Sequence, residues 1–136
     1  MDLSDCLHLG ASVTQETLVK DQHTAPHVGS GNAKVLATPV LVTLFESAAL
    51  AVIESSLPAG AQSLGTRLEI YHTAATPTEM KVKVTATLSA IKGQSLSFEL
   101  VAHDEVEQIG SGRHERVVVD KEKFDLRVQA KNNSSK

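Results

Sequence analysis

The chain has 136 residues, a net charge of −3 and a hydrophobic fraction of 41%, which favour one globular domain over residues 1–136. Aromatic residues make up only 3% of the chain and no basic stripe is visible, so we expect no nucleic-acid partner. The single cysteine, Cys6, excludes an internal disulfide, and acids stand where a secretory signal carries basic residues, so we expect a cytoplasmic protein.

The first half of the chain is predicted to hold one short strand, a long connection and one long helix. Residues 13–19 read as a short strand, whereas residues 20–37 are polar and contain Pro and Gly, as irregular binding loops do. Thr38 suits the N-cap of the helix and Pro39 its first position. Pro58 and Gly60 follow its end, which gives a helix of about eighteen residues.

This helix is apolar almost all round, so we expect other structure to cover most of it. Residues 35–53 hold one charge, Glu46, near their middle. A lone carboxylate at the centre of a bilayer is costly, so the pattern favours a buried helix of a soluble protein with no membrane partner.

The second half of the chain is predicted to consist of strands. Four segments have strand-like patterns, namely residues 64–72, 80–90, 95–102 and 108–120. Alternation places one set of apolar side chains of the second segment on a single face: Met80, Val82, Val84, Ala86, Leu88 and Ala90. Gly93 marks a hairpin between the second and third segments.

With residues 13–19, these segments make about five strands, which short turns should pair antiparallel. One long helix against such a sheet is an α+β layer, and a central helix wrapped by a curved sheet is the hotdog fold. Residues 126–136 are polar, so we expect a loose tail there.

Three residues stand out as candidates for chemistry. Glu46 lies among apolar helical neighbours, where burial of an unpartnered carboxylate is costly, unless it reaches water at the edge of the helix. Thr38 precedes it by eight residues, so the two can share a face, although an N-cap role would also explain Thr38. His72 can shuttle a proton near neutral pH, or it can be a satisfied histidine at a strand end.

The other histidines are predicted to be structural or solvated. His23 and His27 have a spacing that binds metals on a helix, but their loop contains Pro and Gly, so we expect no metal. His8, His103 and His114 lie among polar residues, so we expect them to be solvated.

Four motifs occur in a fixed order, "SLGT", "HTAATP", "AHD" and "IGSG" followed by "HER", after the helix that begins "ATPVLVTLFE". From about Val35 to Phe124 the chain therefore resembles the hotdog-fold fluoroacetyl-CoA thioesterase family. The resemblance implies an enzyme that hydrolyses a small acyl-CoA thioester with a catalytic set of Thr38, Glu46 and His72. It also implies that Gly65 borders the acyl pocket and that Arg116 lies near it.

The resemblance further implies a homodimer that binds its acyl-CoA substrate at or near the subunit interface, and we expect no cofactor. Gly29 and Asn32 stand where the lid of the fluoroacetyl-CoA enzyme is aromatic, and Ser47 replaces the aromatic residue after the Glu. We therefore carry over the reaction class and not the fluorinated substrate. Two alternatives remain open on the same fold: a non-catalytic acyl-CoA-binding module and an enoyl-thioester hydratase.

Overall fold

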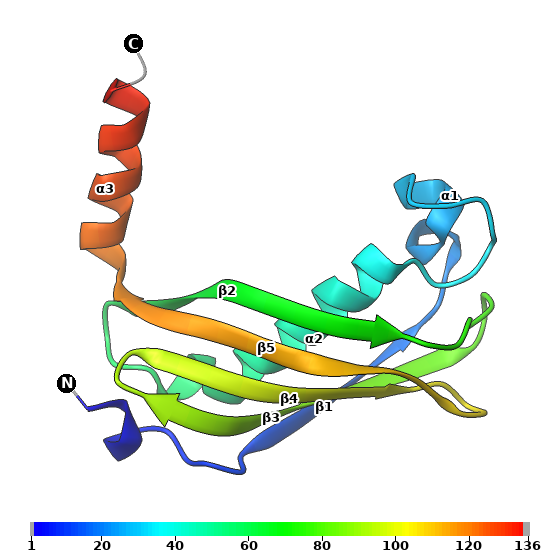
Figure 1. The fold of residues 1–136 in the computed structure, drawn as a ribbon, viewed down its shortest axis with the longest axis horizontal. Coiled ribbons are helices and arrows are strands. Elements are labelled where there is room, and N and C mark those ends of the chain that lie inside the picture. Colours follow the sequence, from blue (N-terminus) through cyan, green and yellow to red (C-terminus); the bar gives the residue numbers. More distant parts are fainter. Residues whose placement is uncertain (1, 135–136) are drawn as a thin grey trace.

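The computed structural model describes residues 2–134. The helical elements are η1 (Leu3–Asp5), η2 (Asp21–His23), α1 (Ala25–Val28), α2 (Thr38–Ile53), η3 (Glu54–Ser56) and α3 (Lys121–Ser134). The strands are β1 (Ser12–Leu18), β2 (Ala61–His72), β3 (Lys81–Lys92), β4 (Ser95–His103) and β5 (Gln108–Asp120). They form one five-stranded antiparallel sheet in the order β1-β3-β4-β5-β2. Figure 1 shows α2 along one face of this sheet, which confirms the predicted α+β hotdog arrangement.

The core lies between α2 and the sheet. Five side chains of α2 are buried, and their spacing of three, four and one residues places them on one stripe: Leu41, Phe45, Ala48, Ala49 and Ile53. This stripe packs mainly against β3 and β1. Full burial of a side chain such as Phe45 stabilises the fold by roughly 1.5–3 kcal/mol.

The rest of α2 is less covered than the sequence predicts. Val40, Val42, Leu44 and Leu50 are only partly buried, so an apolar side of the helix stays accessible in the single chain. The stretch Thr38–Ser56 is long and apolar enough to span a membrane, but its buried stripe packs on the sheet. The prediction that other structure covers most of this helix was therefore wrong for one chain.

All five predicted strands are present, but the face pattern of β3 changes near its end. The register with β4 shifts between Leu88 and Ala90, as at a β-bulge. One extra residue reverses the faces that follow, so Ala90 borders the outer face of the sheet and Ile91 packs against the core. The hairpin at Gly93 was predicted correctly, and Gly93 has a φ of 59°, which glycine adopts readily.

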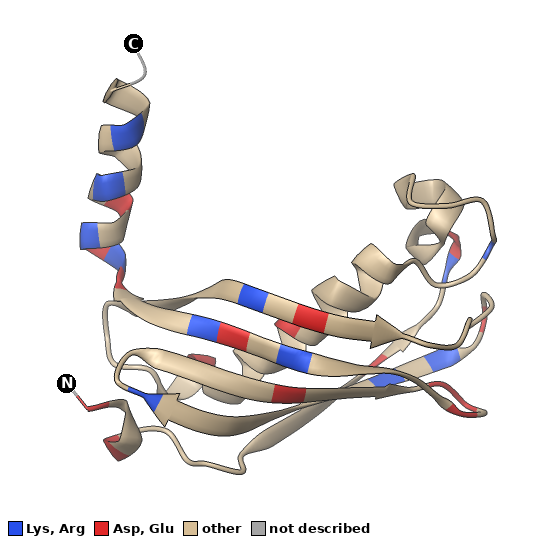
Figure 2. Ribbon diagram, viewed as in Figure 1, with Lys and Arg blue, Asp and Glu red and all other residues tan. Residues whose placement is uncertain are grey.

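The two segments predicted to be irregular contain helical structure. Residues 20–37 include η2 and α1, and residues 126–134 belong to α3, whereas residues 135–136 lie outside the described part. Asp120 accepts from the backbone N–H of Lys123 at 3.0 Å, as an N-cap does, and Lys121 pairs with Asp125 at 3.1 Å. α3 projects from the body with interleaved acids and bases (Figure 2), so local helix chemistry accounts for it.

The N-terminal turn closes one part of the core. Leu3 and Leu7 are buried there. Cys6 is partly buried, and its Sγ donates to the carbonyl oxygen of Leu3 at 3.4 Å.

Candidate active site

Thr38 and His72 meet where α2 begins and β2 ends. The N-cap of α2 is Ala37, so Thr38 occupies the first helical turn and the prediction of Thr38 as N-cap was wrong. Its hydroxyl is therefore available to another partner, and Oγ1 lies 2.7 Å from Nδ1 of His72. This is a strong hydrogen-bonding distance for a hydroxyl and an imidazole.

The other ring nitrogen of His72 is unsatisfied. Nε2 is buried and has no hydrogen-bond partner among the described residues. Burial lowers the pKa of His72 below its ordinary value of 6.5, against a smaller opposing effect of the Ala74 backbone. His72 is therefore neutral at neutral pH, and its free nitrogen is in a state that can exchange a proton with a bound reactant.

A cavity of about 310 Å³ borders this pair. Most of the side chains around it are small, and the wall consists of Ala25, Ser30, Val35, Leu36, Ala37, Thr38, His72, Thr73, Ala74 and Ala75. The small residues that follow His72 therefore leave room around its imidazole.

Hydrogen bonds fix the loop that follows His72. The backbone N–H of Thr73 donates to the carbonyl of Ile109 at 2.8 Å. The buried hydroxyl of Thr76 donates to the carboxylate of Asp104 at 2.9 Å, and the carbonyl of Thr76 accepts from the N–H of Leu36 at 2.8 Å. These bonds tie the "HTAATP" loop to the "AHD" turn and to the segment before α2, so three motifs hold one cavity wall.

Glu46, Gly65 and Arg116 form a second group, further along α2. Oε2 of Glu46 lies 3.8 Å from Nη1 of Arg116. A Cβ added to Gly65 would lie 2.9 Å from the same carboxylate oxygen. Gly65 is thus the position on β2 that leaves room for the Glu46 carboxylate beside Arg116.

Glu46 differs from its prediction in two respects. Its side chain is 44% exposed, so in the single chain this carboxylate reaches water and is not buried among apolar neighbours. It also lies about 12 Å along the helix axis from Thr38, since eight residues rise by 1.5 Å each. The structure therefore pairs Thr38 with His72 and does not bring Glu46 into the wall of their cavity.

Arg116 is buried and its guanidinium is held by neighbours. Nε donates to Oγ of Ser63 at 2.8 Å, and Nη2 donates to the carbonyl of Ser63 at 3.2 Å. Nη1 lies 3.1 Å from Nε2 of His114. Burial lowers the pKa of Arg116, and the charge of Glu46 opposes this effect.

The prediction that His114 is solvated was wrong, because its side chain is only 1% exposed. Alternation along β5 places His114, Arg116 and Val118 on the face toward α2, and all three are buried. This alternation was the available signal, but polar neighbours on both sides hid it. His103 and His8 are exposed, as predicted.

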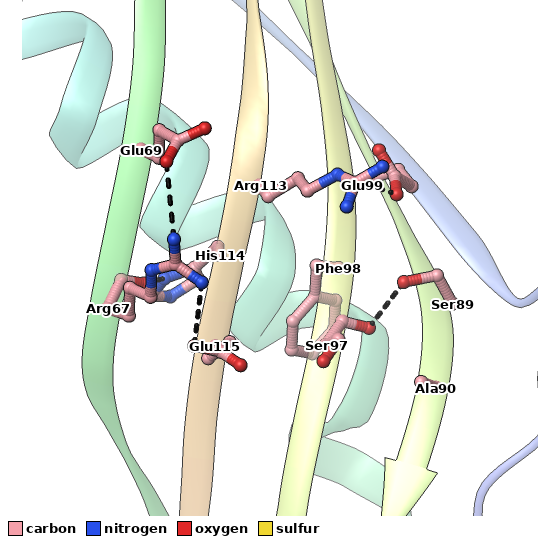
Figure 3. Close-up of a pocket in the computed structure, with 10 residues that line it drawn as sticks. All are labelled: Arg67, Glu69, Ser89, Ala90, Ser97, Phe98, Glu99, Arg113, His114 and Glu115. Atoms are coloured by element: carbon pink, nitrogen blue, oxygen red, sulfur yellow. Dashed lines mark hydrogen bonds and ion pairs between the residues drawn. The ribbon is translucent and has the colours of Figure 1, made fainter.

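A hollow of about 390 Å³ lies on the outer face of the sheet (Figure 3). Its charges are paired: Arg67 lies 3.3 Å from Glu69 and 3.7 Å from Glu115, and Arg113 lies 3.3 Å from Glu99. Because these side chains pair with one another, the hollow has no unpaired charge among them that would attract a charged ligand. Within residues 2–134 no three His, Cys, Asp or Glu side chains converge on a site that could hold a metal.

Comparisons with known proteins identify the family of this chain. The family profile for fluoroacetyl-CoA-specific thioesterases matches residues 19–122. The fluoroacetyl-CoA thioesterase of Streptantibioticus cattleyicolor is 37% identical over 135 residues, which cover 95% of this chain and 97% of that enzyme. The chain belongs to the fluoroacetyl-CoA-specific thioesterase family. The predicted family and the predicted enzyme class, a thioester hydrolase, are thereby confirmed.

Solved structures support the same fold. One structure of the fluoroacetyl-CoA thioesterase superposes with a TM-score of 0.86 at 37% identity, over 92% of this chain and 97% of that one. A hot-dog-like protein from Thermanaerovibrio acidaminovorans gives a TM-score of 0.89 at 22% identity, over 96% of this chain and 97% of that one. At that lower identity the similarity concerns the fold alone.

Proposed function

We propose that the protein hydrolyses a small acyl-CoA thioester to the free acid and coenzyme A, with Thr38, Glu46 and His72 as the catalytic set. The observation that carries this proposal is the buried, unpartnered Nε2 of His72 beside a cavity, with Nδ1 tied to Thr38. A structure of a fluoroacetyl-CoA thioesterase variant, 38% identical to this chain, contains fluoroacetate and CoA. That complex supports acyl-CoA as the substrate class.

The small side chains of the cavity support a short acyl group. Ala74 and Ala75 leave space at His72, and among the described residues no Phe, Tyr or Trp lines the cavity. Gly29 and Asn32, in the segment that precedes α2, are exposed. We therefore propose an unsubstituted short acyl chain rather than a fluorinated one as the preferred substrate.

Two chemical schemes use this catalytic set. In the first, the Glu46 carboxylate attacks the thioester carbonyl, the C–S bond breaks, and coenzyme A leaves as a thiolate from an acyl anhydride. Neutral His72 then takes a proton from the water that attacks the anhydride, which releases the carboxylate. The imidazolium returns its proton to the thiolate or to solvent.

In the second scheme no anhydride forms. His72, with Glu46, takes a proton from a water whose oxygen attacks the thioester carbonyl, and the Thr38 hydroxyl donates to the oxyanion. The tetrahedral intermediate then collapses, the C–S bond breaks, and the proton held by His72 passes to the coenzyme A thiolate. The resemblance to the family favours the covalent scheme. Both schemes need Glu46 closer to His72 than one chain places it.

A homodimer would complete this site. β2 is an edge strand, and the adjoining side of α2 carries partly exposed apolar residues, so a second copy has both a strand and a helix face to pair with. Antiparallel pairing of two β2 strands about an axis between Leu68 and Glu69 would set Gly65 opposite His72 of the second subunit. Because Glu46 lies against Gly65, it would then approach the Thr38–His72 pair across the interface.

The first experiment is thiol release from acetyl-, propionyl-, butyryl- and fluoroacetyl-CoA. We expect turnover of the short acyl chains and a loss of roughly 10²–10⁴-fold in Glu46→Gln and His72→Ala. Unchanged rates in both variants would overturn the assigned roles. Loss of crotonyl-CoA absorbance without thiol release would indicate a hydratase, and tight binding without turnover would indicate a binding module.

The second experiment tests the shared site. Glu46→Gln and His72→Ala proteins are mixed in equal amounts, unfolded and refolded together. Half of the dimers then contain one subunit of each variant. If the catalytic set spans the interface, one of the two sites in such a dimer has both Glu46 and His72, so about a quarter of wild-type activity should return. No recovery from a mixture that forms dimers would contradict a site shared between subunits.

A further inference from the structure

The hydrogen bonds of His114 fix the protonation state of its ring. Nδ1 lies 2.8 Å from the carbonyl oxygen of Arg67, and a carbonyl only accepts, so Nδ1 carries a proton. Nε2 lies 3.1 Å from Nη1 of Arg116, and a guanidinium only donates, so Nε2 carries none. The partners therefore select one neutral tautomer.

The same ring holds the guanidinium that faces Glu46. Ser63 accepts from Nε and Nη2 of Arg116, and His114 accepts from Nη1. Nη1 is also the atom that lies 3.8 Å from Oε2 of Glu46. One of the three hydrogen bonds that hold this guanidinium, the one at Nη1, thus depends on an acceptor that is present only while His114 is neutral.

We propose that His114 is a positioning residue for thioester hydrolysis, because its neutral imidazole orients Arg116 toward the Glu46 carboxylate. This role rests on the proposed function of Glu46. His114 acts through Arg116 and touches no reacting atom. Protonation of His114 would remove the acceptor and place an imidazolium 3.1 Å from the guanidinium, so Arg116 would lose one of its three hydrogen bonds and Nη1 would be repelled.

The surroundings of His114 define the sense of its pH dependence. The charged groups that act on it are Arg116 from β5 and Glu46 from α2, together with Glu115, which lies on the opposite face of β5. β2 offers the Arg67 carbonyl and β4 the uncharged ring of Phe98. Burial is the main cause that lowers the pKa of His114 below 6.5, and Arg116 lowers it further, against the Arg67 carbonyl and the two carboxylates. The positioning role is therefore available at neutral pH and is lost in acid.

Two substitutions separate the acceptor from the ring. His114→Phe keeps a planar ring and removes the acceptor, whereas His114→Gln offers an amide oxygen to Arg116 and does not titrate. We expect His114→Phe to lower kcat about tenfold with little change in KM, because one hydrogen bond to a charged group is lost. His114→Gln should recover most of that loss, and its kcat should fall less steeply than wild type below pH 6.5.

Two controls isolate this route. His8→Phe changes an exposed histidine and should leave kcat and its pH profile unchanged. In a Glu46→Gln background, His114→Phe should cause no further loss, because the effect passes through Glu46.

A direct readout does not depend on activity or on variants that fold poorly. Nitrogen chemical shifts of wild-type His114 should show a neutral ring protonated at Nδ1 at neutral pH. A ring protonated at Nε2, or wild-type kcat in His114→Phe beside an inactive Glu46→Gln, would overturn the positioning role and leave the proposed function standing. Full activity of Glu46→Gln would instead overturn the proposed function, whatever the tautomer.

Discussion

The hydroxyl of Thr38 lies 2.7 Å from Nδ1 of His72, although 34 positions separate the two residues. The contact exists because α2 begins beside the last residue of β2. The positive dipole end of α2 therefore lies beside the cavity, whose wall includes Ala37 and Thr38. The same helix end disfavours an imidazolium at rest and favours an oxyanion during reaction.

Removal of the Thr38 hydroxyl should impair catalysis. Thr38→Val keeps the shape of the side chain, and we expect kcat to fall about 10²-fold because a donor to the oxyanion and a partner of His72 are lost. Thr38→Ser should retain most activity. Thr43→Val is the matched control, because the Thr43 hydroxyl on the same helix donates to the carbonyl of Pro39 at 3.2 Å and not to His72. Equal losses in the two valine variants would contradict this role.

A side chain at Gly65 should displace the Glu46 carboxylate, to which we assign a catalytic role. The added Cβ of Gly65→Ala would lie 2.9 Å from Oε2 of Glu46 and 3.1 Å from Cε1 of His114, closer than such atoms normally approach. We expect a fall in kcat of about tenfold, or 1.4 kcal/mol in the barrier, with a near-normal melting temperature. The double variant Gly65→Ala/Glu46→Asp tests this clash, because Asp is shorter than Glu by one methylene group. Its kcat should be higher than the value calculated by adding the effects of the two single variants.

Stability should decrease as the pH falls below neutral. His72 and His114 have lowered pKa values in the folded protein, mainly because of burial, so the unfolded chain binds more protons below the ordinary value of 6.5. The contribution of the two neutral imidazoles to the free energy of unfolding is fully present above pH 6.5 and is lost as the pH falls below it. The lowered pKa of Asp104 acts only below its ordinary value of 3.8, outside this window.

Urea unfolding at about pH 7.5 and about pH 5.5 measures this effect. The double variant His72→Gln/His114→Gln should show a smaller difference in unfolding free energy between the two pH values than wild type. An unchanged difference would show that other groups dominate.

Gly112→Ala should destabilise the sheet strongly. A Cβ at Gly112 would overlap the carbonyl oxygen of Glu69 and lie 2.9 Å from Cα of Ile70, so the clash is with the backbone of β2. Backbone cannot move aside as a side chain can, and we expect a loss of roughly 2–4 kcal/mol in the free energy of unfolding. Gly31→Ala is the control, because its nearest neighbour, Cβ of Ala25, lies at 3.4 Å. Similar unfolding curves for the two variants would contradict the prediction.

Much of the fold follows from local patterns. Alternation located all five strands, and Gly93 located one hairpin. The reversal of faces at Ala90 was missed because a bulge depends on pairing with β4, which no local pattern encodes. The helix α3 was missed because its residues bury nothing, although Asp120 supplied an N-cap signal.

The site was only partly visible in the sequence. The hydrogen bond of Thr38 to His72 was not predicted. With Thr38 as N-cap the helix would begin at Pro39, whereas it begins at Thr38 and its N-cap is Ala37. The exposure of Glu46 depends on how much of α2 the sheet covers, which composition alone does not specify. His114 was missed because polar residues on both sides of it resemble a solvated segment.

The solitary Cys6 simplifies measurement of turnover. A thiol reagent can label each chain once at most, since no other cysteine is present in the sequence. The reaction of the protein's own thiol with the reagent therefore contributes at most one equivalent of signal per chain. Any signal beyond this first equivalent counts molecules of released coenzyme A, whereas the first equivalent measures the concentration of chains.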